Sequence, residues 1–418
     1  MYFNDKGFDH LDLSDPCSGN NGVGGTHYCF LMLADALKKY TEHDVYYYHY
    51  HNNYFPSGVQ SRKLDTLKEI QEKVVSDHID IFIFRLESTP EFMCCFERFT
   101  IPCVAWTHNP VHADDLKWFY DTVCIKRVVF VGREQYDKHI DHPVIDKSTY
   151  IYNMFNGSRF DIRELPDEAA VTYTGSLSTS KGFHLLAKVW KGILDKVPGA
   201  QLYVIGSGTL YNRNSTLGKL GIASKDYEDS FLPYLSTDGK LLPSVHFMGT
   251  MGMEKLSIYN KTTVGVMNPS GRTETFGLSA VEMEACGIPV VTKAANGLLD
   301  TSINGKTGFL VHNERELKDR IIYLLSHPAE NIKMGKYAKE FVSKFEPELI
   351  VKEWDQLFTD IINGKPAVYI KPTENYFNSS KWIRVFNRSL QQHHLHTPSV
   401  IQMEMSVHRL ILRLRGIR

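Results

Sequence analysis

The sequence predicts an α/β protein built from two doubly wound parallel sheets, each in its own domain. Short apolar runs of strand length recur with helical stretches between them, which is the pattern of parallel strands buried on both faces. The runs form two series separated by a polar segment, and 418 residues are enough for about two to four domains. Such sheets bind ligands at the carboxyl ends of their strands, so we expect the functional site there.

The first series opens the chain. Residues 1–3 are long enough only for a short strand. The glycine-rich stretch 22–25 stands directly before a segment whose apolar residues have helical spacing. The further strands that we expect in this series lie at 79–84, 101–106, 128–131 and 150–152.

The second series begins near residue 170, after the polar stretch 161–168, which we interpret as a linker. Its predicted strands lie at 171–173, 201–205, 245–248, 264–267 and 289–292. An amphipathic helix follows Pro347, and a Gly-Lys-Pro break precedes a basic tail. We therefore expect domains at 1–157 and 158–346, a C-terminal helix at 347–380 that crosses back toward the first domain, and the tail at 381–418.

The charge of the chain is unevenly distributed. The chain has 47 basic and 48 acidic residues, a net charge of −1, which argues against a nucleic-acid-binding protein, and its 43% hydrophobic content argues against disorder. The tail carries seven basic residues and one acid, Glu404, so its charge is +6 and residues 1–380 carry −7.

The end of the tail has the pattern of a basic amphipathic helix. Val407, Leu410, Ile411 and Leu414 share one helical face, although Leu412 lies outside it. Arginines 409 and 413 lie off this face, and arginines 415 and 418 follow. Such a helix can lie on an anionic membrane surface, here the inner face of a plasma membrane. A final helix packed on the body of the protein, or a disordered end, explains the pattern equally well.

Cysteine usage and hydropathy predict a cytoplasmic protein. The seven cysteines form no Cys-x-x-Cys pair and no even framework, which indicates reduced thiols. No apolar run reaches the roughly 18 residues that span a bilayer, and the N-terminus lacks the pattern of a secretion signal. We therefore expect a protein that is neither secreted nor membrane-spanning.

The strongest motif lies at residues 269–289. A buried strand is followed by Pro-Ser, then by Glu-x-Phe-Gly with Glu274, then by Glu282 and by Ala-Cys-Gly-x-Pro. We expect a helix from near Gly277 to Gly287, whose first amides form a phosphate site. Carboxylates accept hydrogen bonds from the neighbouring hydroxyls of a sugar. In isolation both glutamates could equally be solvated, and Glu284, on another helical face, is expected to be exposed.

This composite resembles the signature of retaining nucleotide-sugar glycosyltransferases of the GT-B fold, in particular family 4 (group 1), in which seven residues separate two glutamates. The resemblance covers about 171–358 and extends loosely to the first domain. It implies two Rossmann-like domains facing across a cleft, with the acceptor on the N-terminal side and the nucleotide sugar on the C-terminal side. It also implies that Glu282 binds the donor ribose, that Glu274 lies near the donor sugar, and that the amides of Phe276, Gly277 and Leu278 face the diphosphate and sugar.

The same resemblance assigns further residues of the second domain. Lys181 matches a lysine that clamps the diphosphate, although a surface lysine would fit the sequence as well. Ser176 stands where the family commonly has arginine, and Arg272 is a candidate to replace that charge. Gly206 would let the nucleoside approach, although tight turns use the same pattern. Gly249 and Thr250 match positions of backbone contact to the base.

Two sites are assigned in the first domain. Gly24 and Gly25 lie in the glycine-rich loop that the family places near the donor diphosphate, and a structural turn is the alternative. His108 directly follows a predicted strand, where the family's histidine contacts the donor sugar without acting as a general base. The stretch 46–54, rich in tyrosine and histidine, suits an acceptor-sugar groove but is explained equally well by an ordinary strand and loop.

The resemblance implies a retaining hexosyltransferase that moves a hexose from a nucleotide-diphosphate sugar to a hydroxyl of a glycan or lipid-linked acceptor, as in bacterial surface polysaccharide assembly. It assigns catalysis to His108, Lys181 and Glu274. No Asp-x-Asp dyad stands beside the donor motif, so we expect no metal and no cofactor. The alternatives are a GT-B nucleotide-sugar epimerase, a glycan phosphorylase, or a non-catalytic GT-B partner subunit that binds glycan or another transferase.

Overall fold

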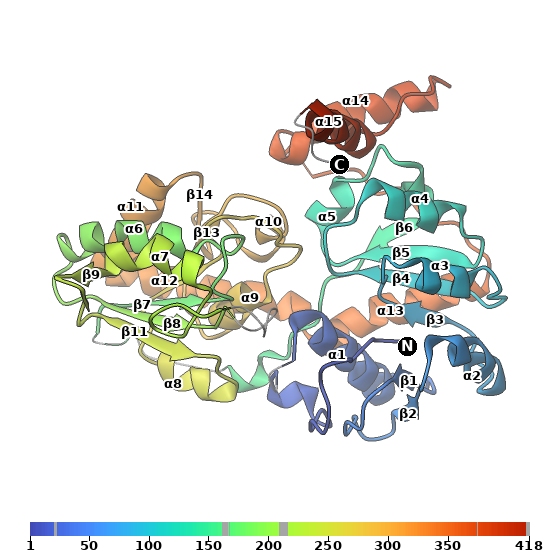
Figure 1. The fold of residues 1–418 in the computed structure, drawn as a ribbon, viewed down its shortest axis with the longest axis horizontal. Helices are drawn as coiled ribbons and strands as arrows, with labels where there is room; N and C mark the ends of the chain where they lie inside the picture. Colours follow the sequence, from blue (N-terminus) through green and yellow to red (C-terminus); the bar gives the residue numbers. More distant parts are fainter. Residues whose placement is uncertain (21–22, 161–165, 167, 209–215, 374, 415–418) are drawn as a thin grey trace. The chain divides into compact units, whose positions relative to one another are not determined.

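The computed structural model describes residues 1–20, 23–160, 166, 168–208, 216–373 and 375–414 (Figure 1). The chain divides into two compact units. Unit 1 comprises residues 1–14, 33–153 and 350–418, and unit 2 comprises residues 15–32 and 154–349. Each unit has its own parallel sheet and its own hydrophobic core, and each is described by itself.

Unit 2 is built on a parallel sheet that has six strands among the described residues, in the order β11-β8-β7-β12-β13-β14. Five of these strands lie at or within a residue or two of the predicted positions, which confirms the second series. Their bounds, with those of β14, are β7 Ala170–Thr174, β8 Gln201–Ile205, β11 Val245–Gly249, β12 Val264–Met267, β13 Val290–Lys293 and β14 Gly308–Val311. A short antiparallel pair, β9 (Ser236–Thr237) and β10 (Lys240–Leu241), lies apart from this sheet.

The helices of unit 2 bury apolar faces against this sheet. Phe183, Leu186, Trp190 and Ile193 recur at helical spacing along α6 and are fully buried, as expected for a helix covering a sheet. Asn313 caps α11 by accepting a hydrogen bond from the Glu316 amide. The helices are α6 Phe183–Leu194, α7 Lys225–Phe231, α8 Leu256–Tyr259, α9 Leu278–Ala285, α10 Leu298–Thr301, α11 Glu314–Ser326 and α12 Pro328–Val342.

Unit 1 contains a four-stranded parallel sheet in the order β3-β4-β5-β6 and a parallel pair, β1 and β2. The prediction of a strand at 1–3 is reduced to single bridges, because Tyr2 pairs with both Tyr48 and Phe84 and so links the two groups of strands. The predicted strand at 79–84 is shortened to β3. The bounds are β1 Tyr46–His49, β2 Gln60–Lys63, β3 Phe82–Phe84, β4 Cys103–Thr107, β5 Ile125–Phe130 and β6 Ser148–Tyr150.

Helices from both ends of the chain belong to unit 1. Trp354 of α13 is fully buried, with its ring centre 4.9 Å from that of Trp106 in β4. Helix α1 begins in the residues of unit 2 and ends in those of unit 1. The helices are α1 Gly25–Tyr40, α2 Ile70–Ser76, α3 Pro90–Phe96, α4 Ala113–Asp121, α5 Arg133–Asp137, α13 Pro347–Ile362, α14 Lys381–Gln392 and α15 Val400–Leu414.

All seven cysteines lie in described parts of the chain and are free thiols, in agreement with the sequence prediction.

Candidate functional site

The loop between β12 and α9 has an unusual backbone. Asn268, Gly271, Thr273 and Gly277 have positive φ angles of 39°, 68°, 54° and 100°. Asparagine and threonine in this region cost on the order of 1–3 kcal/mol each and persist only where the surroundings hold them. The loop that carries Glu274 is therefore held in one shape at a cost in stability, which is a feature of binding sites.

The side chain of Asn268 holds this loop in place. Its Oδ1 accepts a hydrogen bond from the Gly271 amide (3.1 Å), and its Nδ2 lies 3.0 Å from the carbonyl oxygen of Arg272 and 3.1 Å from Glu274 Oε2. Ser270 ties the same loop to the one after β7 by donating to the carbonyl oxygen of Ser180 (2.6 Å). Sequence reasoning missed Asn268, although a polar residue directly after a buried strand was the available signal.

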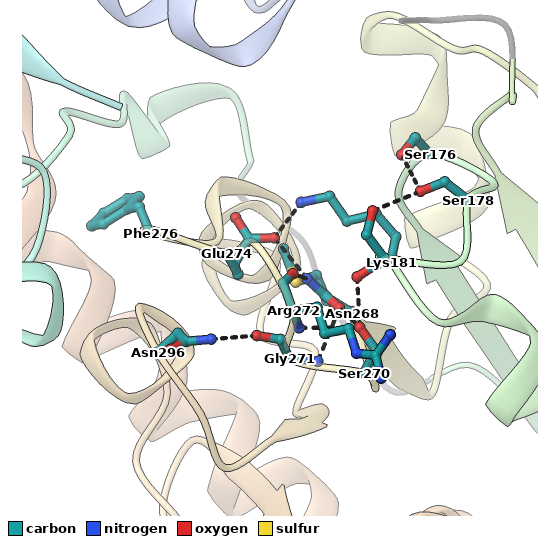
Figure 2. A network of polar contacts seen from close by, with 12 residues as sticks. Ser176, Ser178, Lys181, Asn268, Ser270, Gly271, Arg272, Glu274, Phe276 and Asn296 are labelled. Atoms are coloured by element: carbon teal, nitrogen blue, oxygen red, sulfur yellow. Dashed lines mark hydrogen bonds and ion pairs between the residues drawn. The ribbon is translucent and has the colours of Figure 1, made fainter. Parts of the chain in front are cut away.

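Lys181 and Glu274 form an ion pair where the loop after β7 meets the loop before α9 (Figure 2). Lys181 Nζ lies 2.7 Å from Glu274 Oε2, and the two side chains are 21% and 11% exposed, so the pair is neither buried nor fully solvated. Lys181 comes from the loop after β7 and precedes Gly182, where an added Cβ would lie 2.7 Å from the backbone nitrogen of Ser270. The two loops therefore pack backbone to backbone, and two of the three predicted catalytic side chains are in contact.

Glu282 occupies a more enclosed place on α9. Its side chain is 9% exposed, its Oε2 lies 2.8 Å from Lys255 Nζ, and Tyr259 Oη is 3.5 Å away. Burial together with the negative charge of Glu282 raises the pKa of Tyr28 well above its ordinary value, so Tyr28 also lies near this carboxylate. A buried ion pair contributes little to stability, since desolvation offsets most of its attraction. Lys255, which sequence reasoning missed, belongs to this site by contact.

The prediction that Glu284 is exposed is wrong. Its side chain is fully buried and accepts hydrogen bonds from Ser302 Oγ and Thr307 Oγ1, both at 2.9 Å. Burial raises the pKa of this carboxyl well above its ordinary value. The reason is that α9 is covered on nearly all sides, so a helical face other than that of Glu282 is still an interior face.

The predicted phosphate-binding helix is present. Helix α9 begins at Leu278, directly after Gly277 in the left-handed conformation, and Gly287 after its end has φ 71°. The Ala280 amide donates to the Gly277 carbonyl (2.9 Å). The amides before it lie at the positive end of the helix dipole, where a helix offers them no acceptor of its own. The Phe276 side chain is buried against Phe345 and turns away from the Lys181–Glu274 pair (Figure 2), so only its backbone belongs to this edge.

The predicted glycines of the strand ends differ in what surrounds them. An added Cβ on Gly206 would lie 1.9 Å from the carbonyl oxygen of Gly175, and the Gly206 amide donates to the carbonyl of Gly249 (2.8 Å). Gly206 is therefore required by the close approach of β7, β8 and β11. Gly249 has φ 73° but open space around a Cβ, and Thr250 beside it is exposed.

The glycine-rich loop lies only partly in the described structure, because residues 21–22 are outside it. Helix α1 starts at Gly25, and, its chain neighbours and own helix backbone aside, the described structure has no atom within 4 Å of the position that a Cβ on Gly25 would take. Asn20 brackets the loop by hydrogen bonds of its side chain to both backbone groups of Val23 (2.8 and 3.0 Å). Gly24, by contrast, contributes its carbonyl to the first turn of the helix, accepting from the Tyr28 amide.

His108 belongs to unit 1, directly after β4 as predicted. Its side chain is buried and its ring packs against Trp106, with the ring centres 4.3 Å apart. Burial, reinforced by the positive charge of Arg85, lowers the pKa of His108 to about 3. The imidazole is therefore neutral at physiological pH, where it can donate a hydrogen bond but carries no charge.

The arginine that is missing at Ser176 has a counterpart nearby. Ser176 Oγ lies 3.4 Å from Ser178 Oγ and offers no charge. Arg272 is exposed on the loop that carries Glu274 (Figure 2). Burial, then the charge of Lys188 and to a smaller extent that of Arg272, lowers the pKa of His184 at the start of α6. Lys181 and Arg272 thus place two cations on neighbouring loops.

Among the described residues, no three His, Cys, Asp or Glu side chains gather as a metal site. Within the same residues no helix is long and apolar enough to cross a membrane.

Comparison with known proteins assigns part of the chain to a family. Residues 156–341 match the family described as Glycosyl transferases group 1. Trehalose synthase of Pyrococcus horikoshii is 28% identical over 213 residues, 49% of this chain and 46% of that protein. The capsular polysaccharide biosynthesis glycosyltransferase CapM of Staphylococcus aureus is 28% identical over 201 residues, 47% of this chain and 48% of that protein. The chain thus spans about half the length of these curated relatives.

A solved structure extends the comparison to the fold of both units. The Anabaena protein HepE in complex with UDP aligns with 86% of this chain and 100% of that chain, with a TM-score of 0.63 and 17% sequence identity. At this identity the likeness concerns the fold alone. It confirms the predicted two-domain α/β fold of the GT-B type.

Proposed function

We propose that the protein is a retaining glycosyltransferase that transfers a hexose from a nucleotide-diphosphate sugar to a hydroxyl group of a glycan or lipid-linked acceptor. The observation that carries the proposal is the pairing of Lys181 with Glu274 on strained, interlocked loops beside the first turn of α9. The group 1 match over residues 156–341 contains all three of these features and supports the same reaction class.

The diphosphate of the donor would bind where positive charge gathers. Lys181 and Arg272 supply cations, and the first amides of α9, at Gly277 and Leu278, supply oriented donors at the positive end of a helix dipole. Fixed donors and charges aimed at a leaving phosphate cost no reorganisation during the reaction. In this arrangement Glu274 holds the lysine in position until the more highly charged diphosphate competes for it.

Glu282 would bind the ribose. Lys255 and Tyr259 both contact Oε2, so we assign Oε1 to the ribose hydroxyls. Lys255 compensates the charge of the buried Glu282 carboxylate by direct contact. We therefore assign Lys255 to positioning rather than to contact with the sugar.

The reaction itself needs little covalent help from the protein. The bond between the anomeric carbon and the phosphate oxygen breaks, the acceptor oxygen bonds to that carbon on the same face, and the acceptor proton moves to the leaving phosphate. Glu274 and His108 would orient the donor sugar, with His108 acting as a neutral hydrogen-bond donor because its pKa is lowered to about 3. The protein thus acts by position and charge, without a metal ion.

The setting that we propose is cytoplasmic assembly of a surface polysaccharide, with the protein peripheral to the inner face of the plasma membrane. The relative named for capsular polysaccharide biosynthesis supports the choice of product class. The second candidate, a non-catalytic GT-B partner subunit, is favoured by the absence of arginine at Ser176.

The experiment is a panel of nucleotide hexoses incubated with the protein, with release of nucleoside diphosphate and the fate of the sugar measured. We expect release with at least one donor, a raised KM for Glu282→Ala and a lowered kcat for Lys181→Ala. Lys188→Ala, a lysine on α6 in a solvent-exposed pair with Glu314, is the matched control. Normal turnover in both site variants would refute the assignments, epimerised donor would indicate an epimerase, and absence of both release and nucleotide binding would indicate the partner subunit.

A further inference from the structure

Helix α14 (Lys381–Gln392) packs on unit 1 with its charged face. Lys381 is fully buried and lies 2.5 Å from Glu134 and 2.9 Å from Asp137. Arg384, 4% exposed, lies 3.5 Å from Asp141, and Asn387 donates to the same carboxylate. The polar side of this helix therefore compensates three carboxylates buried in unit 1. That side is part of the fold and is not available to a partner.

The opposite side of α14 is apolar and faces outward. Trp382 and Phe386, one turn apart, are 53% and 61% exposed, and Phe377 just before the helix is 88% exposed. A surface helix of a globular protein normally buries its apolar side and exposes its charges. On α14 Val385 packs on the core, but Trp382 and Phe386 face outward while Lys381 and Arg384 are buried. The outward aromatic side chains are therefore available to an apolar partner.

Helix α15 (Val400–Leu414) packs beside α14 and has an exposed apolar side of its own. It contacts α14 and α4, and Figure 1 shows α14 and α15 together at one end of unit 1. Ile401 packs on the core and Leu412 is half-buried, so one side of α15 faces the protein and explains why Leu412 lies outside the apolar stripe. The other side carries an exposed apolar stripe with exposed fractions of 38–79%: Met403, Val407, Leu410, Ile411 and Leu414.

Positive charge borders this stripe. Arg409 and Arg413 lie along one flank at helical spacing, and both are exposed. Arg409 is 2.8 Å from Asp114, but that pair is itself more than half exposed and is weak in water. Arginines 415 and 418 follow in the sequence.

We propose that the outward sides of α14 and α15 form a docking surface for an anionic lipid bilayer, on which both helices lie in the plane of the interface. An apolar stripe flanked by arginines matches acyl chains below and anionic headgroups above, and tryptophan is favoured at that depth. A second copy of this chain is a poorer occupant, because a two-fold interface would place the same basic flank against itself. This inference rests on the membrane setting of the proposed function and names the surface that would carry it, whereas the reaction chemistry does not depend on it.

Substitutions on the outward side test the proposal without disturbing the fold. Removing the whole tail would leave the buried carboxylates of unit 1 without their positively charged partners, so point variants are required. The variants are Leu410→Ser with Leu414→Ser, and Trp382→Ala with Phe386→Ala. Val123→Ser, at a valine that is 81% exposed on another part of unit 1, is the matched control. All variants should unfold at the wild-type temperature.

The measurement is sedimentation with vesicles of phosphatidylcholine alone or mixed with phosphatidylglycerol. The wild type and Val123→Ser should bind the anionic vesicles and not the neutral ones, each double variant should bind at least about tenfold more weakly, and binding should fall with salt. Tryptophan fluorescence should shift to the blue on binding, and Trp382→Ala with Phe386→Ala should abolish the shift. Trp106, Trp190 and Trp354 are already fully buried, and the half-buried Trp118 is still present in that variant. Three results would overturn the proposal. They are wild-type protein that does not bind anionic vesicles, double variants that bind as tightly as the wild type, and a concentration-dependent dimer that the same variants abolish.

Discussion

Substitution of Gly25 by alanine tests whether this glycine is needed for the fold or for binding a ligand. Gly25 is the first residue of α1, and its φ is not in the left-handed region. Apart from its chain neighbours and the backbone of its own helix, no atom of the described residues lies within 4 Å of the position of an added Cβ. Alanine at such a position stabilises a protein by about 0.4–1 kcal/mol, mainly by restricting the unfolded chain. We therefore expect Gly25→Ala to raise the melting temperature of the free protein by about 1–3 °C.

The same substitution should weaken the binding of the donor, although it stabilises the free protein. If the diphosphate lies against this loop, the new methyl group occupies space that the ligand needs, and overpacking of this size costs about 1–3 kcal/mol. This corresponds to binding weaker by about 5- to 100-fold, since about 1.4 kcal/mol is a factor of ten. The assay is calorimetric titration of UDP into the wild type and Gly25→Ala, with thermal unfolding of the same samples without ligand.

Two results would refute this reasoning. Unchanged UDP affinity in a stabilised variant would mean that the loop does not approach the diphosphate. A variant that melts below the wild type would mean that the glycine serves a structural turn, as the alternative interpretation of the sequence holds.

Gly206→Ala should destabilise the protein by about 3 kcal/mol or more in urea unfolding, because its Cβ would lie 1.9 Å from the carbonyl oxygen of Gly175. Gly249→Ala, with φ 73° in the left-handed region and open space around a Cβ, should cost about 1 kcal/mol, and equal costs for the two substitutions would contradict the argument. Glu284→Gln should match or exceed wild-type stability at neutral pH, because burial raises the pKa of this carboxyl and the amide oxygen still accepts from Ser302 and Thr307; a lower melting temperature would show that the charged form is required. Burial lowers the pKa of His142 to about 4, so its stabilisation is complete above pH 6.5 and is lost, by up to about 3 kcal/mol, as the pH falls toward 4. His142→Asn keeps a cap for the Val144 amide and should flatten that slope in urea unfolding at several pH values; an unchanged slope would assign it to other groups. Chelation by EDTA should leave donor turnover unchanged, and lost activity restored by a divalent cation would refute the metal-free proposal.

The sequence predicted the buried strands well and the polar ones poorly. Strand 264–267 is apolar and buried throughout because both faces of a parallel sheet are covered. Strand β2 (Gln60–Lys63) is polar, and β14 begins with Gly308, which reads as a turn. That glycine is needed because a Cβ would lie 2.0 Å from the carbonyl oxygen of Val290, a contact that no local pattern reveals.

The residues of the candidate site also fall into two groups: those that a sequence motif predicts and those that only the folded chain reveals. Lys181, Glu274 and Glu282 were found because each lies in a short motif with fixed spacing. Lys255 and Asn268 were missed because their importance comes from contacts made in the folded chain. The helical spacing of α9 separated Glu282 from Glu284 correctly, but it could not tell solvent from interior on a helix covered on nearly all sides.

For the charged tail, too, the sequence does not reveal the contacts that form in the folded chain. The sequence gives +6 for residues 381–418, but it does not say which charges meet buried acids. In the structure Lys381 and Arg384 compensate carboxylates inside unit 1, and the arginines of α15 are exposed. The packed final helix and the amphipathic surface, alternatives in the sequence, thus describe two sides of the same segment.

Calorimetric titration of nucleoside diphosphates into the wild type, Lys181→Ala and Lys188→Ala tests the central claim most directly. Lys181→Ala removes a cation and leaves Glu274 to repel the ligand, so the affinity should fall by at least about tenfold, the scale of one charged hydrogen bond. The wild type should bind at least one nucleoside diphosphate, and Lys188→Ala should bind it equally well. Failure of the wild type to bind any of them, or equal affinity in the two lysine variants, would contradict the assignment of this strand-end edge as the donor site.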